Sequence, residues 1–124
     1  MGTKNTVLWT WHLGAGLVLI VLLGLHMFGM HLNDILHLAE GDPISWESVA
    51  ARAVEISQVL FYILFLGFAL YHGLYGLRNI LLELNPSPGM AGFINKALIV
   101  VGLVLFAFGT WAAIAARSTA MASM

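Results

Sequence analysis

Residues 6–31 read TVLWTWHLGAGLVLIVLLGLHMFGMH, without one formally charged side chain. A bilayer core about 30 Å thick is crossed by about 20 helical residues, so this run is long enough to span it. In hydrocarbon each backbone amide needs an internal hydrogen bond, which predicts a helix. The apolar core is too long for a signal peptide, and no small-residue cleavage pattern follows it closely, so we expect a retained span.

Two further apolar runs follow, at about 56–83 and about 93–116. Of the 124 residues, 60% are hydrophobic and only 9% are charged, whereas a soluble domain carries roughly a quarter charged residues. Lipid must therefore be the main solvent for the outside of the protein. The sequence predicts an all-α integral membrane protein of three transmembrane helices, with residues 1–124 forming one membrane-anchor domain.

Two unlike loops join the predicted helices. The outer loop, at 32–55, holds every acidic residue except Glu83, and it also holds His37, which we expect to be solvated. Ser45 is a candidate N-cap for a lead-in to the second helix. The second loop, Asn-Pro-Ser-Pro-Gly at 85–89, is short and rigid, so the second and third helices should form a tight antiparallel pair.

The few basic residues divide between the two membrane faces. Lys4, Arg78 and Lys96 lie on one side, and Arg52 and Arg117 lie on the other. Basic residues favour the cytoplasmic side, which places the N-terminus inside and the acidic loop outside. We therefore expect a multi-pass protein of the cell inner (cytoplasmic) membrane.

Composition also excludes several function classes. The absence of cysteine rules out disulfides, iron–sulfur ligation and thiolate metal sites within this chain. A net charge of −1 gives no electrostatic case for binding nucleic acid.

His26 and His72 lie within the spans and carry most of the functional information. An ionisable side chain in a membrane tends to face the bundle and to have a partner. The plainest partner is a carbonyl or hydroxyl of a neighbouring helix. Glycines lie near both, among them Gly24 and Gly76, and no acid lies near either within the spans. A neutral imidazole bound to haem iron is the alternative, because histidine is a common axial haem ligand.

The two histidines differ in depth. At about 1.5 Å per residue, His26 lies about 10 Å outside the midpoint of its helix and His72 about 7 Å inside. They are then about 15–20 Å apart along the membrane normal and cannot bind one iron. If both bind haem, there are two haems, and each needs a second ligand from a partner chain. His31, at the outer boundary, is the reserve candidate.

A second set of candidates lies at the inner membrane boundary. Trp9, Trp11 and His12 are at the inner end of the first helix, and Arg78 is at the inner end of the second. Their plain roles are interfacial anchoring and, for Arg78, a snorkelling charge. Their functional alternative is the vicinity of a haem propionate or of a quinone.

The stretch YHGLYGLRNILLE at 71–83 resembles the second-helix signature of complex II membrane anchors. These are the hydrophobic, cytochrome b subunits (D/C-type) of succinate dehydrogenase and quinol:fumarate reductase. Their pattern is a haem-associated histidine, a glycine four residues on, often Leu-Arg, and then an acidic residue. Here these positions are His72, Gly76, Leu77, Arg78 and Glu83.

Elsewhere the chain departs from the family. The first-helix motif reads His-Leu-Gly-Ala-Gly at 12–16, with Leu13 and Ala15 where relatives carry an arginine and a hydroxyl that help bind quinone. Leu84 replaces a tyrosine that often follows the acidic residue. The resemblance therefore implies that partner subunits supply more of the quinone ligands.

The resemblance implies a non-catalytic subunit of a respiratory oxidoreductase. It would bind one or two haem b groups, shared with a second anchor subunit, through His72 at the inner haem and His26 at the outer. An iron–sulfur subunit and a flavoprotein would deliver electrons from succinate to a quinone, or carry them in the reverse direction, and Glu83 would lie in the vicinity of a haem propionate or of the quinone. Two other readings stay open. One is an anchor of another membrane redox complex of the di-haem cytochrome b type, and the other is a non-redox three-helix assembly or transport subunit.

Overall fold

A computed structural model describes residues 3–32, 35–36 and 42–123. The helices in these ranges are α1 (Thr3–Met27), the π-helical turn η1 (Phe28–Leu32), α3 (Trp46–Val54), α4 (Ile56–Glu83) and α5 (Pro88–Ala122). Three helices are long and apolar enough to cross a membrane: Thr6–His31, Ile56–Glu83 and Pro88–Ala122. The prediction of an all-α protein with three membrane-length helices is confirmed. His37, predicted to be a solvated loop residue, lies outside the described residues.

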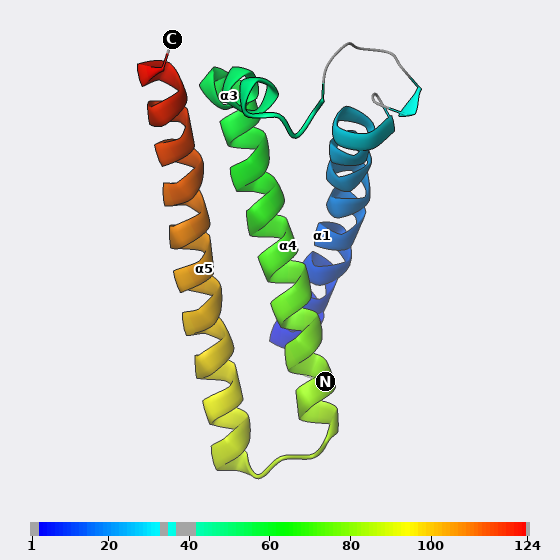
Figure 1. The fold of residues 1–124 in the computed structure, drawn as a ribbon. Helices are drawn as coiled ribbons and strands as arrows, with labels where there is room; N and C mark the ends of the chain where they lie inside the picture. Colours follow the sequence, from blue (N-terminus) through cyan, green and yellow to red (C-terminus); the bar gives the residue numbers. More distant parts are fainter. Residues whose placement is uncertain (1–2, 33–34, 37–41, 124) are drawn as a thin grey trace.

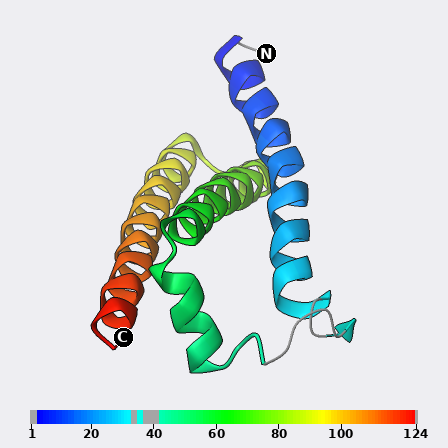
Figure 2. The same ribbon diagram turned by 90° about the horizontal axis from the view of Figure 1, so that it is seen from above.

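The middle helix of the bundle is α4, which packs against α1 and against α5. The three long helices alternate in direction, and α1 crosses α4 at an angle (Figures 1 and 2). In the described part of the chain only Ala15, Val59 and Ala120 are buried. With so few buried residues, most apolar side chains of the three helices are exposed. This exposure is expected when lipid surrounds the helices.

The turn between α4 and α5 is short because Asn85, Ser87 and Pro88 each favour the conformation that they have there. Asn85 has a positive φ of 55°, a conformation that asparagine tolerates better than most residues. The Ser87 side chain then caps α5 by accepting a hydrogen bond from the backbone N–H of Met90, and Pro88 occupies the first turn, where its missing N–H costs nothing. Consequently α5 begins before the apolar stretch predicted at 93–116, and it also continues past it to Ala122.

Close packing holds α5 against α4 at three glycines. A Cβ on Gly67 would lie 3.3 Å from the Phe106 ring, and a Cβ on Gly102 would lie 2.9 Å from Leu74 Cδ1. A Cβ on Gly109 would overlap the Leu66 side chain. Small residues allow helix backbones to approach closely in membranes, where packing drives association.

The short helix α3 lies across the outer ends of α4 and α5 (Figure 1). The predicted N-cap is confirmed, because Ser45 Oγ accepts a hydrogen bond of 3.3 Å from the Ser48 backbone N–H. The helix ends at Glu55, whose extended ψ of 115° separates it from α4. The Arg117 guanidinium donates to the Val54 carbonyl, 3.2 Å away, and so ties α5 to the end of α3.

Candidate functional site

His12 on α1 and His72 on α4 meet near the end of the bundle where α1 begins, which the sequence predicts to be the inner end. Their rings stack with centroids 4.2 Å apart and planes 8° from parallel. The Nδ1 atom of His72 lies 3.1 Å from the backbone carbonyl oxygen of His12. Gly16, one turn further along α1, allows this approach, because a Cβ there would lie 2.9 Å from Cε1 of His72.

The hydrogen bond to His12 fixes the tautomer of His72. A carbonyl oxygen only accepts hydrogen bonds, so Nδ1 carries the proton and Nε2 keeps its lone pair. From sequence, the plainest partner for His72 is a carbonyl of a neighbouring helix, and the structure shows such a carbonyl. This hydrogen bond uses only one of the two ring nitrogens. Metal-binding histidines characteristically donate their other ring N–H to a carbonyl or carboxylate. The arrangement at His72 therefore fits an axial haem ligand.

The side chain of His12 lies between His72 and Tyr75, whose ring centroid is 5.2 Å away. Its Nδ1 is buried and has no hydrogen-bond partner among the described residues. A Cβ on Gly76 would lie 3.4 Å from Cε1 of His12. The glycine four residues after His72 thus lies at ordinary contact distance from the ring of His12, which sequence reasoning had not paired with His72.

His26 occupies a second site towards the outer end. Its ring lies edge-on to Tyr62, with centroids 6.2 Å apart, and 5.7 Å from the ring of Phe65. It lines a cavity of about 380 Å³ together with Arg52 of α3 and Gln58 of α4. This open, partly polar space fits a group held at His26 and completed from outside the chain.

The two histidine sites lie at different depths. His26 contacts α4 at Tyr62, whereas His72 lies further along the same helix, by about 15 Å at about 1.5 Å per residue. His31 lies in the wide π-helical turn η1 and is exposed. The structure thus places His26 and His72 at different positions along α4 and does not bring the candidate ligands to one centre.

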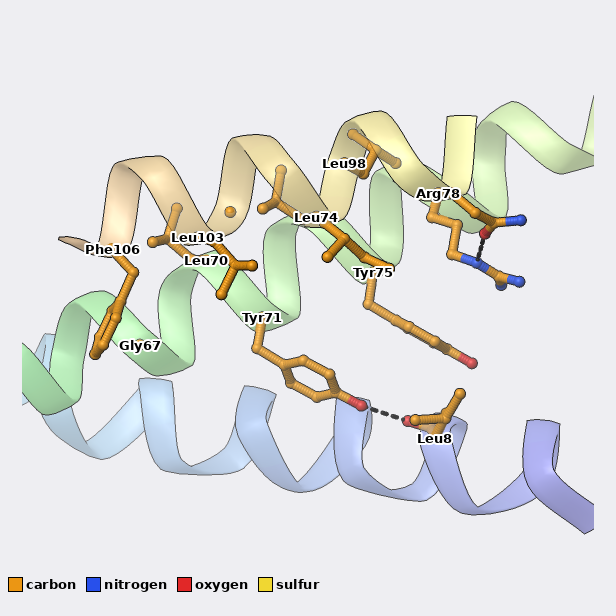
Figure 3. A pocket seen from close by; sticks show the side chains of 13 residues that line it. Leu8, Gly67, Leu70, Tyr71, Leu74, Tyr75, Arg78, Leu98, Leu103 and Phe106 are labelled. Atoms are coloured by element: carbon orange, nitrogen blue, oxygen red, sulfur yellow. Dashed lines mark hydrogen bonds between the residues drawn. The ribbon is translucent and has the colours of Figure 1, made fainter. Parts of the chain in front are cut away.

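The remaining candidates do not gather around His72. Trp9 and Trp11 are 52% and 67% exposed, and Glu83 is exposed at the end of α4. The Arg78 guanidinium donates from Nε to the Asn95 side-chain oxygen of α5 (Figure 3). Arg78 is therefore directed towards α5, whereas His72 contacts α1.

The described residues contain no group of three or more His, Asp or Glu side chains that could hold a metal ion. A haem site would not require such a group, because haem iron is already held by the porphyrin and takes single histidines as further ligands.

Comparison with known proteins gives one match. The chain is 28% identical over 96 residues to the succinate dehydrogenase hydrophobic membrane anchor subunit of Thermoplasma acidophilum, covering 77% of this chain and 73% of the relative. The chain resembles a complex II membrane anchor. This match confirms the resemblance expected from the second-helix signature. No family model matches the chain, and no solved structure matches it.

Residues of the stretch that resembles the complex II signature make specific contacts in this fold. A backbone carbonyl of α1 accepts a hydrogen bond from His72, Gly76 lies beside the ring of His12, and Glu83 is the last residue of α4. Gly16, the last residue of the first-helix motif, faces the His72 ring. The first-helix motif at 12–16 and the second-helix motif at 71–83 therefore lie next to each other in space, although they are far apart in sequence.

Proposed function

We propose that this chain is a haem-b-binding membrane anchor subunit of a succinate dehydrogenase. The observation that carries the proposal is the hydrogen bond between His72 Nδ1 and the His12 carbonyl, which leaves Nε2 free to bind iron. The name of the relative, a succinate dehydrogenase membrane anchor, supports the choice of complex. His72 would bind the inner haem and His26 the outer.

A second anchor subunit would complete each haem site. The rings of His12 and His72 stack face to face with centroids 4.2 Å apart, which leaves no room between them for a bound group. His12 therefore cannot be the second ligand to an iron bound at His72. Its carbonyl instead holds the His72 ring in place and keeps the proton on Nδ1.

The bound haem supplies a one-electron carrier within the membrane. This chain would position that carrier, anchor the iron–sulfur subunit and the flavoprotein, and help electrons from the iron–sulfur clusters reach quinone. The inner ends of α1 and α4 would lie near the quinone, with His12, Trp9, Trp11 and Glu83 in its vicinity. The same end carries Arg78 and Lys96, which favours an N-terminus in the cytoplasm and a location in the inner membrane.

The test is a reduced-minus-oxidised visible spectrum of the purified complex. We expect a b-type band in the wild type, loss of the inner haem in His72→Ala and loss of only the outer haem in His26→Ala. His31→Ala tests the reserve candidate on η1: we expect it to keep the wild-type haem content, and loss of the outer haem in His31→Ala but not in His26→Ala would move the outer ligand to His31.

Co-purification of the flavoprotein tests the anchoring role separately. A wild-type complex that contains the flavoprotein but no b-type band would refute haem binding and leave the anchor assignment intact. A normal haem content in assembled His72→Ala would refute the ligand assignment. If the flavoprotein does not co-purify with the wild-type chain, the complex itself is wrongly assigned.

A further inference from the structure

A groove of about 640 Å³ lies between α4 and α5 (Figure 3). Its sides are mainly apolar, and its polar lining is concentrated at the inner end around Arg78. Both helices contribute apolar residues to its lining, among them Leu70, Leu74, Leu98, Ile99, Leu103 and Phe106.

The polar end of the groove is cationic. Arg78 donates to the side-chain oxygens of Asn95 and Asn79 and lies 5.7 Å from the centroid of the Tyr75 ring. All three partners are neutral, and no ion pair to Arg78 occurs among the described residues. Hydrogen bonds to amides satisfy some of its N–H groups, but they do not neutralise its charge.

The charged residues nearest to Arg78 and Asn95 in sequence do not neutralise Arg78. Lys96 follows Asn95 on α5 and is exposed. The nearest acid in sequence, Glu83, lies more than one helical turn beyond Arg78, rotated by about 140° around α4. An anion at the polar end of the groove would therefore meet the Arg78 guanidinium and no facing carboxylate from α4 or the start of α5.

The length of the groove matches one leaflet of a bilayer. From Arg78 to Gly67, α4 rises about 16 Å, and half of a hydrocarbon core of about 30 Å is about 15 Å. With Arg78 at the boundary, the apolar sides reach approximately to the bilayer midplane. A single extended acyl chain of a lipid in this leaflet would run along the same path, from the boundary to the midplane.

We propose that this groove binds one anionic phospholipid, with its phosphate on Arg78 and an acyl chain lying between α4 and α5. A guanidinium pairs well with phosphate oxygens, often through two parallel hydrogen bonds. A quinone would leave the charge unpaired, because its head group is neutral. The proposal is independent of the proposed function, since it holds with or without haem at His72.

The first test measures lipid binding to the purified, delipidated complex by native mass spectrometry. The probes are dioleoylphosphatidylglycerol and, as the zwitterionic comparison, dioleoylphosphatidylcholine. We expect the wild type to retain one phosphatidylglycerol that phosphatidylcholine does not replace, and Arg78→Gln to bind it about tenfold more weakly, as for a lost charge-assisted pair. Arg117→Gln is the matched control, because Arg117 lies at the other end of α5, and it should bind as the wild type does.

A second pair of variants tests the groove itself. Ile99 lines it and is 62% exposed, so Ile99→Trp should fill part of it and also weaken phosphatidylglycerol binding. Ile114, 52% exposed on the same helix and outside the groove lining, provides the control Ile114→Trp.

The proposal is overturned if the wild type binds both lipids equally, or if assembled Arg78→Gln or Ile99→Trp keeps wild-type lipid affinity. It is also overturned if Arg78→Gln shifts a haem midpoint potential while phosphatidylglycerol binding stays unchanged, because Arg78 would then serve a haem propionate. A loss of haem from His72→Ala with normal lipid binding would leave the lipid proposal supported and concern only the haem site.

Discussion

A Cβ atom on Gly16 would lie 2.9 Å from Cε1 of His72 and 3.2 Å from its Nδ1. The clash would be with a rigid ring rather than with the end of a flexible side chain. Gly16→Ala should therefore displace His72 or push α1 away, at a cost of about 1–3 kcal/mol, and lower the inner haem content in the visible spectrum. Gly14→Ala is the control, because a Cβ there meets nothing within 4 Å. Equal haem content in both variants would contradict this account.

Tyr71 connects α4 to α1 through a hydrogen bond of 2.9 Å from its hydroxyl to the Leu8 carbonyl (Figure 3). We expect Tyr71→Phe to lower the free energy of unfolding by about 0.6 kcal/mol, the typical value for such bonds between membrane helices. Unfolding in mixed micelles with increasing SDS measures this difference. Tyr75→Phe should have a smaller effect, because its hydroxyl has no hydrogen bond within the described residues, and the opposite order would refute the assignment.

The packing of α4 on α5 depends on Gly109. Its Cβ would overlap the Leu66 side chain, which must then adopt another rotamer. Gly109→Ala should destabilise the hairpin by about 1 kcal/mol, seen as a lower midpoint of thermal unfolding in detergent. Gly92→Ala serves as the comparison, since nothing lies within 4 Å of its added Cβ. A larger loss of stability in Gly92→Ala would show that this account of the packing is wrong.

The N-cap of α3 can be tested without disturbing the membrane helices. Ser45→Ala removes the acceptor for the Ser48 backbone N–H, and such changes cost about 1 kcal/mol. Backbone amides of α3 should then exchange hydrogen faster, while those of α5 remain unchanged. Unaltered exchange in α3 would mean that contacts with α4 and α5, rather than the cap, hold this helix.

The three spans could be predicted from the sequence because each depends on local composition. A run such as 6–31 has no charged residue and must be helical wherever it lies in lipid. The Ser45 cap is local too, since it involves residues three apart. Sequence reasoning did not foresee that α3 ends at Glu55, because extended backbone at one residue leaves no periodic signal.

The pairing of His12 with His72 could not be predicted in the same way. On α1 alone, His12 shares a face with His26, and nothing in that periodicity says where another helix crosses. The crossing brings α4 close to α1 at Gly16, and Gly76 lies beside the ring of His12. These glycines were the available signal, but small residues also occur wherever membrane helices pack.

The length of α5 has a consequence for how the protein responds to its bilayer. Its apolar stretch at 93–116 extends about 36 Å at about 1.5 Å per residue, which is longer than hydrocarbon about 30 Å thick. Hydrophobic mismatch is commonly relieved by tilting, and the short turn at Asn85 would make α4 lean together with α5. Thinning the membrane should therefore change the angle between α4 and α1, and this change would alter the contact between His72 and Gly16.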